Sequence, residues 1–208
     1  MGIKTRNIEH GYKVLFRSAQ DMLSTAVSGA ALQGMGTGAP PLTEVSTSGF
    51  AGFLMANGDT VHDVIMSPHD ANPLHPAYVR VIYTVNTTNA GHGVTWIGSY
   101  VSVPTDGANS VFLDDSLSAF DTQIAADDAY GSTTEYALKK SAFGVIDSIG
   151  KSDSERTGAG GELLHVQFEQ DAADTAPIFL GYELWYQPVL FGEGTASDKE
   201  LAAPSEDT

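Results

Sequence analysis

Cysteine is absent from this chain of 208 residues. Disulfide bonds, thiolate metal ligands and cysteine nucleophiles are therefore excluded. The fold must be stabilised by the burial of apolar side chains, and a chain of this length can build one domain with a sizeable core.

Basic residues are scarce, because 10 Lys and Arg stand against 26 Asp and Glu, for a formal net charge of −16. Proteins that bind nucleic acid gain much of their affinity from Lys and Arg that neutralise phosphates. We therefore predict that the chain does not bind nucleic acid. A strongly acidic body also stays soluble and repels its own copies.

Long apolar runs are missing as well. No segment approaches the ~18 uncharged apolar residues that a membrane-spanning helix needs. The first ten residues, MGIKTRNIEH, lack the apolar core of a signal peptide. We expect a protein that does not associate with membranes and is not secreted by the general route.

The few basic residues are concentrated near the N-terminus. Residues 1–17 carry a net charge of +3, which leaves −19 for the rest of the chain. The charged residues of this segment are Lys4, Arg6, Glu9, Lys13 and Arg17. A basic segment can dock on an acidic neighbour, although four charges near a terminus can equally well be solvated.

The next segment has the features of a short helix. Ser18 followed by Asp21 resembles a capping box for a helix through Val27, ended by Gly29. Its apolar residues Met22 and Leu23, with Ala26 and Val27, would form one apolar face. Residues 34–49 then read GMGTGAPPLTEVSTSG, a composition typical of an extended linker.

We therefore predict that residues 1–49 form an extended N-terminal arm with a short helix and a linker, and that residues 1–33 of this arm dock on a partner. The predicted docking residues are Lys4, Arg6, Lys13, Arg17, Met22 and Leu23.

From Phe50 onward the pattern has the period of two that is typical of strands. The clearest strands are expected at residues 78–85, 94–103, 162–169 and 178–186, with shorter ones at 50–56, 60–66 and 133–147. Residues 94–103 are apolar enough on both faces to be buried on both sides. In the last strand one face is predicted to carry Ile178, Leu180, Tyr182, Leu184 and Tyr186.

The core of this domain is predicted to contain Trp96, Leu164, Val166 and Phe168. A second short helix is expected where Leu117, Phe120, Ile124 and Ala125 recur at helical spacing.

Many strands without alternating helices predict an all-β fold, an antiparallel β-sandwich that is jelly-roll-like, over residues 50–191. Strand spacing does not distinguish a jelly roll from an immunoglobulin-like sandwich. Residues 192–208 are expected to form an acidic C-terminal tail without structure of its own.

Two motifs suggest ligands, and neither fits well. Between Gly144 and Gly150-Lys151-Ser152 lie five residues, whereas a phosphate-binding loop has four and opens a helix. The densest set of possible metal ligands is His62, Asp63, His69, Asp70 and His75. His62 and Asp63 would point to opposite faces of a strand, so only His69, Asp70 and His75 could gather around an ion. We predict no metal, no cofactor and no catalytic residue, with these side chains serving turns and hydrogen bonds.

Aromatic residues at alternating strand positions leave one binding function open. A platform for stacking sugars would use Trp96, Trp185, Tyr78, Tyr100, Tyr182 and Tyr186. Such aromatic residues more often belong to a core or a subunit interface.

Residues 75–191 resemble a loosely defined group of tailed-phage virion proteins. The matching features are a G-x-V-x-W-like strand with Gly93, Val94 and Trp96, a turn with Ala173, Asp174, Thr175 and Ala176, and a final strand with Leu180, Gly181 and Tyr186. The resemblance implies a jelly-roll-like sandwich in a virion and brings no catalytic residue with it.

These observations together predict a non-enzymatic virion structural protein, a capsid decoration or cement protein on the exterior of a phage head. Its partners would be the major capsid protein or other virion subunits, and symmetric self-contact would make a homo-oligomer such as a trimer. The alternative is a tail, fibre or receptor-binding module that binds host glycans. An enzyme with an unrecognised site is a third hypothesis.

Overall fold

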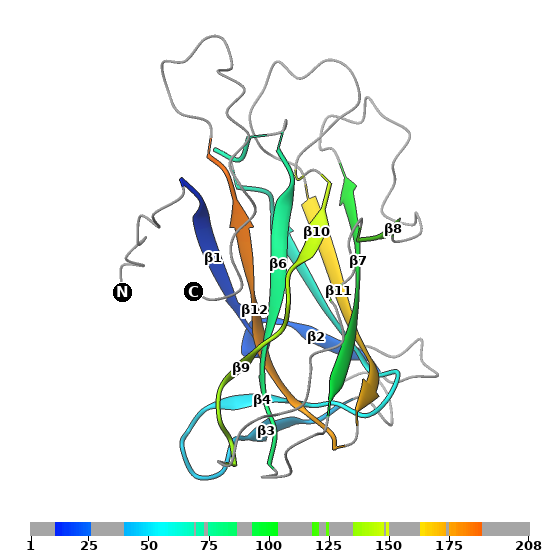
Figure 1. Ribbon diagram of the computed structural model, residues 1–208. Helices are drawn as coiled ribbons and strands as arrows, with labels where there is room; N and C mark the ends of the chain where they lie inside the picture. The colour runs from blue at the N-terminus through cyan, green and yellow to red at the C-terminus, as the bar shows by residue number, and fades with distance from the viewer. Residues whose placement is uncertain are drawn as a thin grey trace.

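The structure is a computed structural model that describes residues 11–25, 40–68, 70–72, 75–86, 93–103, 118–120, 124, 135–147, 149, 163–173 and 175–188. Two antiparallel sheets pack face to face, which confirms the predicted all-β sandwich (Figure 1). Among the described residues no helix is long and apolar enough to cross a bilayer.

Sheet A has the strand order β10-β6-β12-β4-β3, with β1 paired to β12 and β9 paired to β6. Figure 1 shows β1, β12 and β6 side by side, with the short strands β3 and β4 across the lower end. The bounds of its strands are β1 Lys13–Ser18, β3 Leu42–Glu44, β4 Ala51–Leu54, β6 Ala77–Thr84, β9 Lys139–Lys140, β10 Gly144–Ile146 and β12 Ile178–Tyr186.

Sheet B has the strand order β2-β5-β11-β7-β8. Its strands are β2 Leu23–Thr25, β5 Thr60–Met66, β7 Val94–Val103, β8 Ser118–Ala119 and β11 Leu163–Ala173. A single turn of 3-10 helix, η1 Ala19–Asp21, connects β1 in sheet A to β2 in sheet B.

The pairing of the strands defines the topology. β7 pairs with β8, β6 with β10, β5 with β11 and β4 with β12, so the chain forms one long nested antiparallel hairpin. Successive pairs lie in alternate sheets, which means that this hairpin is rolled up around the core. This is the jelly-roll arrangement, and the strand order thus answers the question that spacing left open.

Alternation along the two longest strands of sheet B builds one side of the core. Leu164, Val166 and Phe168 of β11 and Trp96 of β7 are buried, as predicted. The opposite face of β7 is only half-buried, so the prediction that this strand is buried on both sides is wrong.

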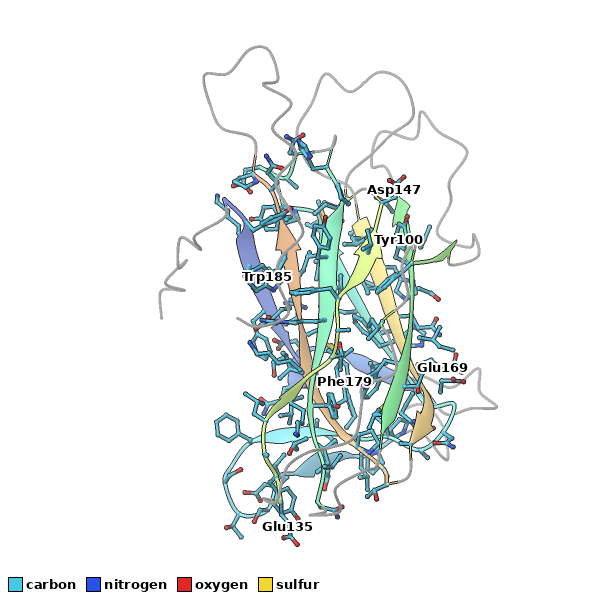
Figure 2. All side chains as sticks on the ribbon, viewed as in Figure 1. Tyr100, Glu135, Asp147, Glu169, Phe179 and Trp185 are labelled. Carbon is cyan, nitrogen blue, oxygen red and sulfur yellow. The ribbon has the colours of Figure 1, made fainter. Side chains whose placement is uncertain are left out.

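Aromatic rings from both sheets meet in the core. The ring of Trp96 lies 5.7 Å from that of Phe179, and the ring of Phe168 lies 5.8 Å from Phe179 and 5.0 Å from Tyr182. Figure 2 shows Phe179 toward the lower end of β12 and Trp185 farther up the strand. Because Trp96 and Phe168 belong to sheet B while Phe179 and Tyr182 belong to sheet A, these rings join the two layers.

A β-bulge in β12 changes the predicted face of this strand. Phe179 pairs with Tyr83 and Gly181 with Ile82, so Leu180 is the extra residue. Phe179 and Tyr182 therefore both enter the core, and Leu180 is only partly buried. Gly181 has φ +149°, and a Cβ atom there would lie 2.1 Å from the carbonyl oxygen of Arg17 on β1. Only glycine allows this bulge beside β1.

The described part of the predicted arm belongs to the sandwich, which corrects the predicted helix and the domain boundary at residue 49. Ser18 does cap a helix, because its Oγ accepts a hydrogen bond from the Gln20 N–H, but that helix ends at Asp21. Ala19 and Met22 are buried in the core, and β2 then pairs with β5. A helix of about 10 residues is marginal in water, whereas these apolar residues gain burial by closing the edge of the sandwich.

Three other predicted segments differ from the structure. Residues 118–119 form β8 rather than a helix, although Phe120 and Ile124 are buried as their pattern suggested. The predicted linker contains β3. The strand expected at 133–147 is two short strands, separated by residues 141–143. The predicted tail at 192–208 and the predicted docking residues Lys4 and Arg6 lie outside the described residues.

Truncation of Phe168 should reveal how much the junction between the sheets stabilises the fold. Phe168→Ala is expected to lower the free energy of unfolding by roughly 3–5 kcal/mol, because it removes a fully buried ring that touches both layers. Chemical denaturation of the two proteins measures this difference. Val64→Ala, at an exposed position of β5, is the control. An equally small effect for both variants would contradict the assigned core.

Candidate functional site

Exposed apolar side chains gather on sheet A. Among the described residues, eight large hydrophobic side chains are exposed, and all but two belong to strands or turns of this sheet. The six are Phe16, Leu42, Phe50, Leu54, Tyr136 and Leu138, and the other two, Val64 and Met66, lie on β5 of sheet B. Clusters of exposed apolar side chains on a soluble protein commonly mark a binding surface.

Three of these side chains line an open groove of about 560 Å³ on the outer face of sheet A. Ile82 of β6 and Leu180 of β12 also line it, and both are more buried than the exposed side chains of Phe16, Phe50 and Leu138. We call this feature the sheet A groove. Lys140 and Glu183, which form an ion pair at 3.2 Å, supply polar atoms to the same lining.

The turn before β4 holds Phe50 in place. The N–H of Val45 donates to the carbonyl of Phe50 at 2.7 Å, and the N–H of Gly49 donates to the Glu44 carboxylate at 2.8 Å. Gly49 adopts φ +78°, which glycine accepts readily. Phe50 is 69% exposed although hydrogen bonds fix the backbone of its turn.

Leu180 lies over Gly52, the glycine of β4. A Cβ atom on Gly52 would lie 2.9 Å from Cδ2 of Leu180 and 2.4 Å from the backbone oxygen of Phe179. The absence of a side chain at Gly52 therefore lets β4 approach β12 and lets Leu180 occupy its place in the lining of the sheet A groove.

A rigid charged cluster adjoins the groove. Arg80 is only 2% exposed, and its Nε donates to Glu183 Oε2 at 2.6 Å. Its guanidinium carbon lies 4.8 Å from the ring centroid of Phe143 and 5.1 Å from that of Trp185. Trp185 Nε1 donates to the same carboxylate at 3.0 Å. Burial raises the pKa of Glu183, but the hydrogen bonds from Arg80 and Trp185 and the charges of Arg80 and Lys140 together outweigh burial, so the net pKa is lowered.

Two of the predicted docking residues form ion pairs with acidic side chains of their own chain. Arg17 of β1 donates two hydrogen bonds to the carboxylate of Asp63 on β5, from Nε at 2.8 Å and from Nη2 at 2.9 Å. Tyr182 Oη donates to the same carboxylate at 2.8 Å. Lys13 forms an ion pair with Asp70, which also accepts a hydrogen bond from Tyr186 Oη at 3.2 Å.

These contacts correct the prediction that Arg17 and Met22 form an exposed docking face. Met22 is buried in the core, and Arg17 links sheet A to sheet B. Leu23 lies in β2, and its side chain is outside what the structure describes. The sequence signal that could have located Arg17 is its spacing of four residues from Lys13, matched by Tyr182 and Tyr186 on the paired strand.

Burial and a neighbouring acid raise the pKa values of Tyr186 and Tyr182. Burial raises the pKa of Tyr186 to about 12, and the charge of Asp70 and its hydrogen bond add to the effect. Burial and the neighbouring Asp63 also raise the pKa of Tyr182 well above its usual value. Both phenols thus remain neutral donors throughout the physiological range.

Of the predicted metal-ligand set His69, Asp70 and His75, only the last two lie within the described residues. Within the described ranges no group of three or more His, Asp or Glu could hold a metal ion, and His69 lies outside those ranges. Of the aromatic residues considered for sugar stacking, Trp96, Trp185, Tyr182 and Tyr186 are buried. Tyr78 and Tyr100 are half-buried.

No family model matches this chain. No curated protein matches it either. One solved structure, a xylan-binding module CBM15, is similar at a TM-score of 0.43 with 9% sequence identity, over 85% of this chain and 98% of the module. The function of this chain is therefore inferred from its own surface.

Neutralising Arg17 should destabilise the fold rather than weaken docking. Arg17→Gln leaves Asp63, whose side chain is 2% exposed, without its cation, so we expect a loss of roughly 3 kcal/mol in unfolding free energy. Lys13→Gln is the matched comparison, because its ion pair is more exposed and should contribute at most about 1 kcal/mol. Denaturant titration distinguishes the two. Equal stability of wild type and Arg17→Gln would contradict the assigned role.

The contribution of Glu183 should depend on pH in a defined direction. Its pKa is lower in the folded chain than in the unfolded chain, so its stabilising effect is present above about pH 4.5 and is lost as the pH falls further. Glu183→Gln should therefore be less stable than wild type by roughly 3 kcal/mol at pH 7, and the gap should narrow in acid. Denaturant midpoints from pH 7 to pH 3 measure the gap. Glu135→Gln, in an exposed turn, is the control, and a gap that does not change with pH would contradict this assignment.

Proposed function

We propose that this protein is a non-enzymatic virion structural protein, a capsid decoration or cement protein that packs on a phage head through the sheet A groove. The observation that carries the proposal is the exposure of Phe16, Phe50 and Leu138 around a groove of about 560 Å³. Exposed apolar side chains that cluster around a groove commonly mark a surface that a partner covers.

The composition of the surface suits a protein partner. Aromatic residues and arginine are enriched at the cores of interfaces, and binding energy concentrates on a few anchors surrounded by a polar rim. The rings of Phe16 and Phe50 are candidate anchors, and the Lys140–Glu183 ion pair supplies polar rim atoms. The fixed turn at Phe50 lowers the entropy that binding must overcome.

The partner would be the major capsid protein or another virion subunit on the exterior of the head. It would present apolar side chains to the groove and basic groups around it, because residues 18–208 carry a net charge of −19. Self-association into a cyclic homo-oligomer such as a trimer is part of the same proposal. Lys4 and Arg6 stay predicted contacts to an acidic neighbour.

The mechanism of such a protein is mass action. A subunit that binds only the assembled shell stabilises the shell, by an amount that rises with its concentration relative to its dissociation constant. The jelly roll suits this task as a rigid body, since ion pairs and aromatic rings link its two layers.

A tail, fibre or receptor-binding module that holds host glycans is the alternative. Jelly rolls occur in viral capsids and also in lectins, so the fold is compatible with both functions. Because both tryptophans are buried and Tyr78 and Tyr100 are half-buried, a sugar platform among the described residues would depend chiefly on the more exposed Phe16 and Phe50.

Polar substitutions in the groove should separate docking from folding. In Phe16→Ser/Phe50→Ser/Leu138→Ser we expect at least a tenfold loss of bound copies per particle, because the substitutions remove three exposed anchors. The unfolding free energy should change little, since these side chains face water in the isolated chain. Quantitative mass spectrometry of purified particles reassembled with each variant counts the copies.

The matched control is Val64→Ser/Met66→Ser, which alters the exposed apolar side chains of sheet B. Normal occupancy of the groove variant would overturn the docking proposal. If wild type binds glycans on an array and is absent from heads, and the groove variant loses that binding, the glycan function replaces it.

A further inference from the structure

Two histidines meet on the outer face of sheet B. His62 comes from β5 and His165 from the neighbouring β11, and they are 103 residues apart in the sequence. His62 Nδ1 lies 3.1 Å from His165 Nε2, and the ring centroids are 5.4 Å apart. In the register of the sheet, His165 pairs with Val64 on one side and with Val101 on the other.

The separation of the two nitrogens suits a shared metal ion. Imidazole nitrogens bind zinc at about 2.0–2.1 Å, so two such bonds enclose nitrogens about 2.9 Å apart at a right angle and about 3.4 Å apart at the tetrahedral angle. The observed 3.1 Å lies between these values. Two rings on adjacent strands of one sheet therefore already stand at the distance that a bound ion would impose.

A second contact orients one of the rings. Thr60 Oγ1 lies 3.1 Å from His62 Nε2, on the side of the ring away from His165. A histidine that ligates a metal through one nitrogen usually donates its other ring N–H to an oxygen, which fixes the tautomer. With the His62 proton on Nε2 and donated to Thr60, Nδ1 carries the lone pair directed at His165.

The charge state is also suitable. Burial lowers the pKa of His62 to about 4, with a smaller contribution from His165. Burial lowers the pKa of His165 as well. Metal binding requires neutral imidazoles, and lowered pKa values favour that state. The proton between the rings would leave His165 Nε2 for its Nδ1, so binding changes the tautomer without releasing a proton.

We propose that His62 and His165 form a binding site for a divalent transition metal ion of the zinc, nickel and copper class, with His62 Nδ1 and His165 Nε2 as its ligands and Thr60 as a positioning residue. Imidazole ligands suit these ions better than magnesium or calcium, which prefer oxygen. Water completes the coordination in the isolated protein. The ion would join β5 to β11.

The proposal is independent of the docking function. The two histidines belong to sheet B, whereas the groove is lined by sheet A, the turns beside its strands and η1. A variant that loses metal binding should keep its occupancy on particles, and the groove variant should keep its metal binding.

Metal titration of the full chain after treatment with a chelator tests the site. We expect one Zn²⁺ per chain by calorimetry, a melting temperature that rises with Zn²⁺ and not with Mg²⁺, and a Cu²⁺ paramagnetic resonance spectrum with splitting from two nitrogens. His62→Gln and His165→Gln should each lose at least tenfold in affinity and show one nitrogen fewer. Thr60→Val should weaken binding about tenfold while both nitrogens remain in the spectrum.

His75→Gln is the matched control, because His75 stands apart in the β5–β6 connection and should leave binding unchanged. Circular dichroism of each metal-free variant shows whether it is folded. If the His62→Gln variant is poorly folded, the His165→Gln and Thr60→Val variants still decide the question. Unchanged affinity in His165→Gln, or a copper spectrum that keeps two nitrogens in it, would overturn the site.

Discussion

The structure depends on a continuous line of side chains that joins the two sheets. Each contact in the line crosses from one sheet to the other, first between aromatic rings and then through a hydrogen bond and an ion pair. In order, the line runs through Tyr83, Trp96, Phe179, Phe168, Tyr182, Asp63 and Arg17. An apolar interlayer that ends in a buried, fully paired carboxylate fixes the relative position of the sheets, because a sliding motion would leave Asp63 without its partners.

This line requires the bulge in β12. Without the extra residue at Leu180, Phe179 and Tyr182 could not both point inward, and the aromatic part of the line would not reach Asp63. The same bulge places Leu180 in the lining of the sheet A groove, and Gly181 lets β1 lie against β12 so that Phe16 lines the groove too. The internal junction and the external groove are thus two consequences of one irregularity in one strand.

Local alternation accounts for what the sequence could predict. Leu164, Val166 and Phe168 alternate with polar residues, and this pattern placed them in the core. The partner of Arg17 could not be predicted, because Asp63 lies 46 residues away, and the four-residue spacing from Lys13 places both cations on one face of a strand without identifying the acid that pairs with either. The pairing of His62 with His165 likewise follows from strand order. The sequence places Met22 on an apolar face. Tertiary contacts decide whether this face packs in its own domain or against a neighbouring protein, so the sequence alone did not show that Met22 is buried.

The internal pairing of the cations changes how the protein could bind a partner. Four basic residues near the N-terminus suggested attraction by charge, but Lys13 and Arg17 are neutralised by Asp70 and Asp63. Only Lys4 and Arg6 are left for that role, and two cations beside a body of net charge −19 make a weak field that physiological salt screens. The free energy of association would then come chiefly from apolar burial in the sheet A groove, which salt affects little. A decoration protein built in this way would stay on its particle over a wide range of ionic strength.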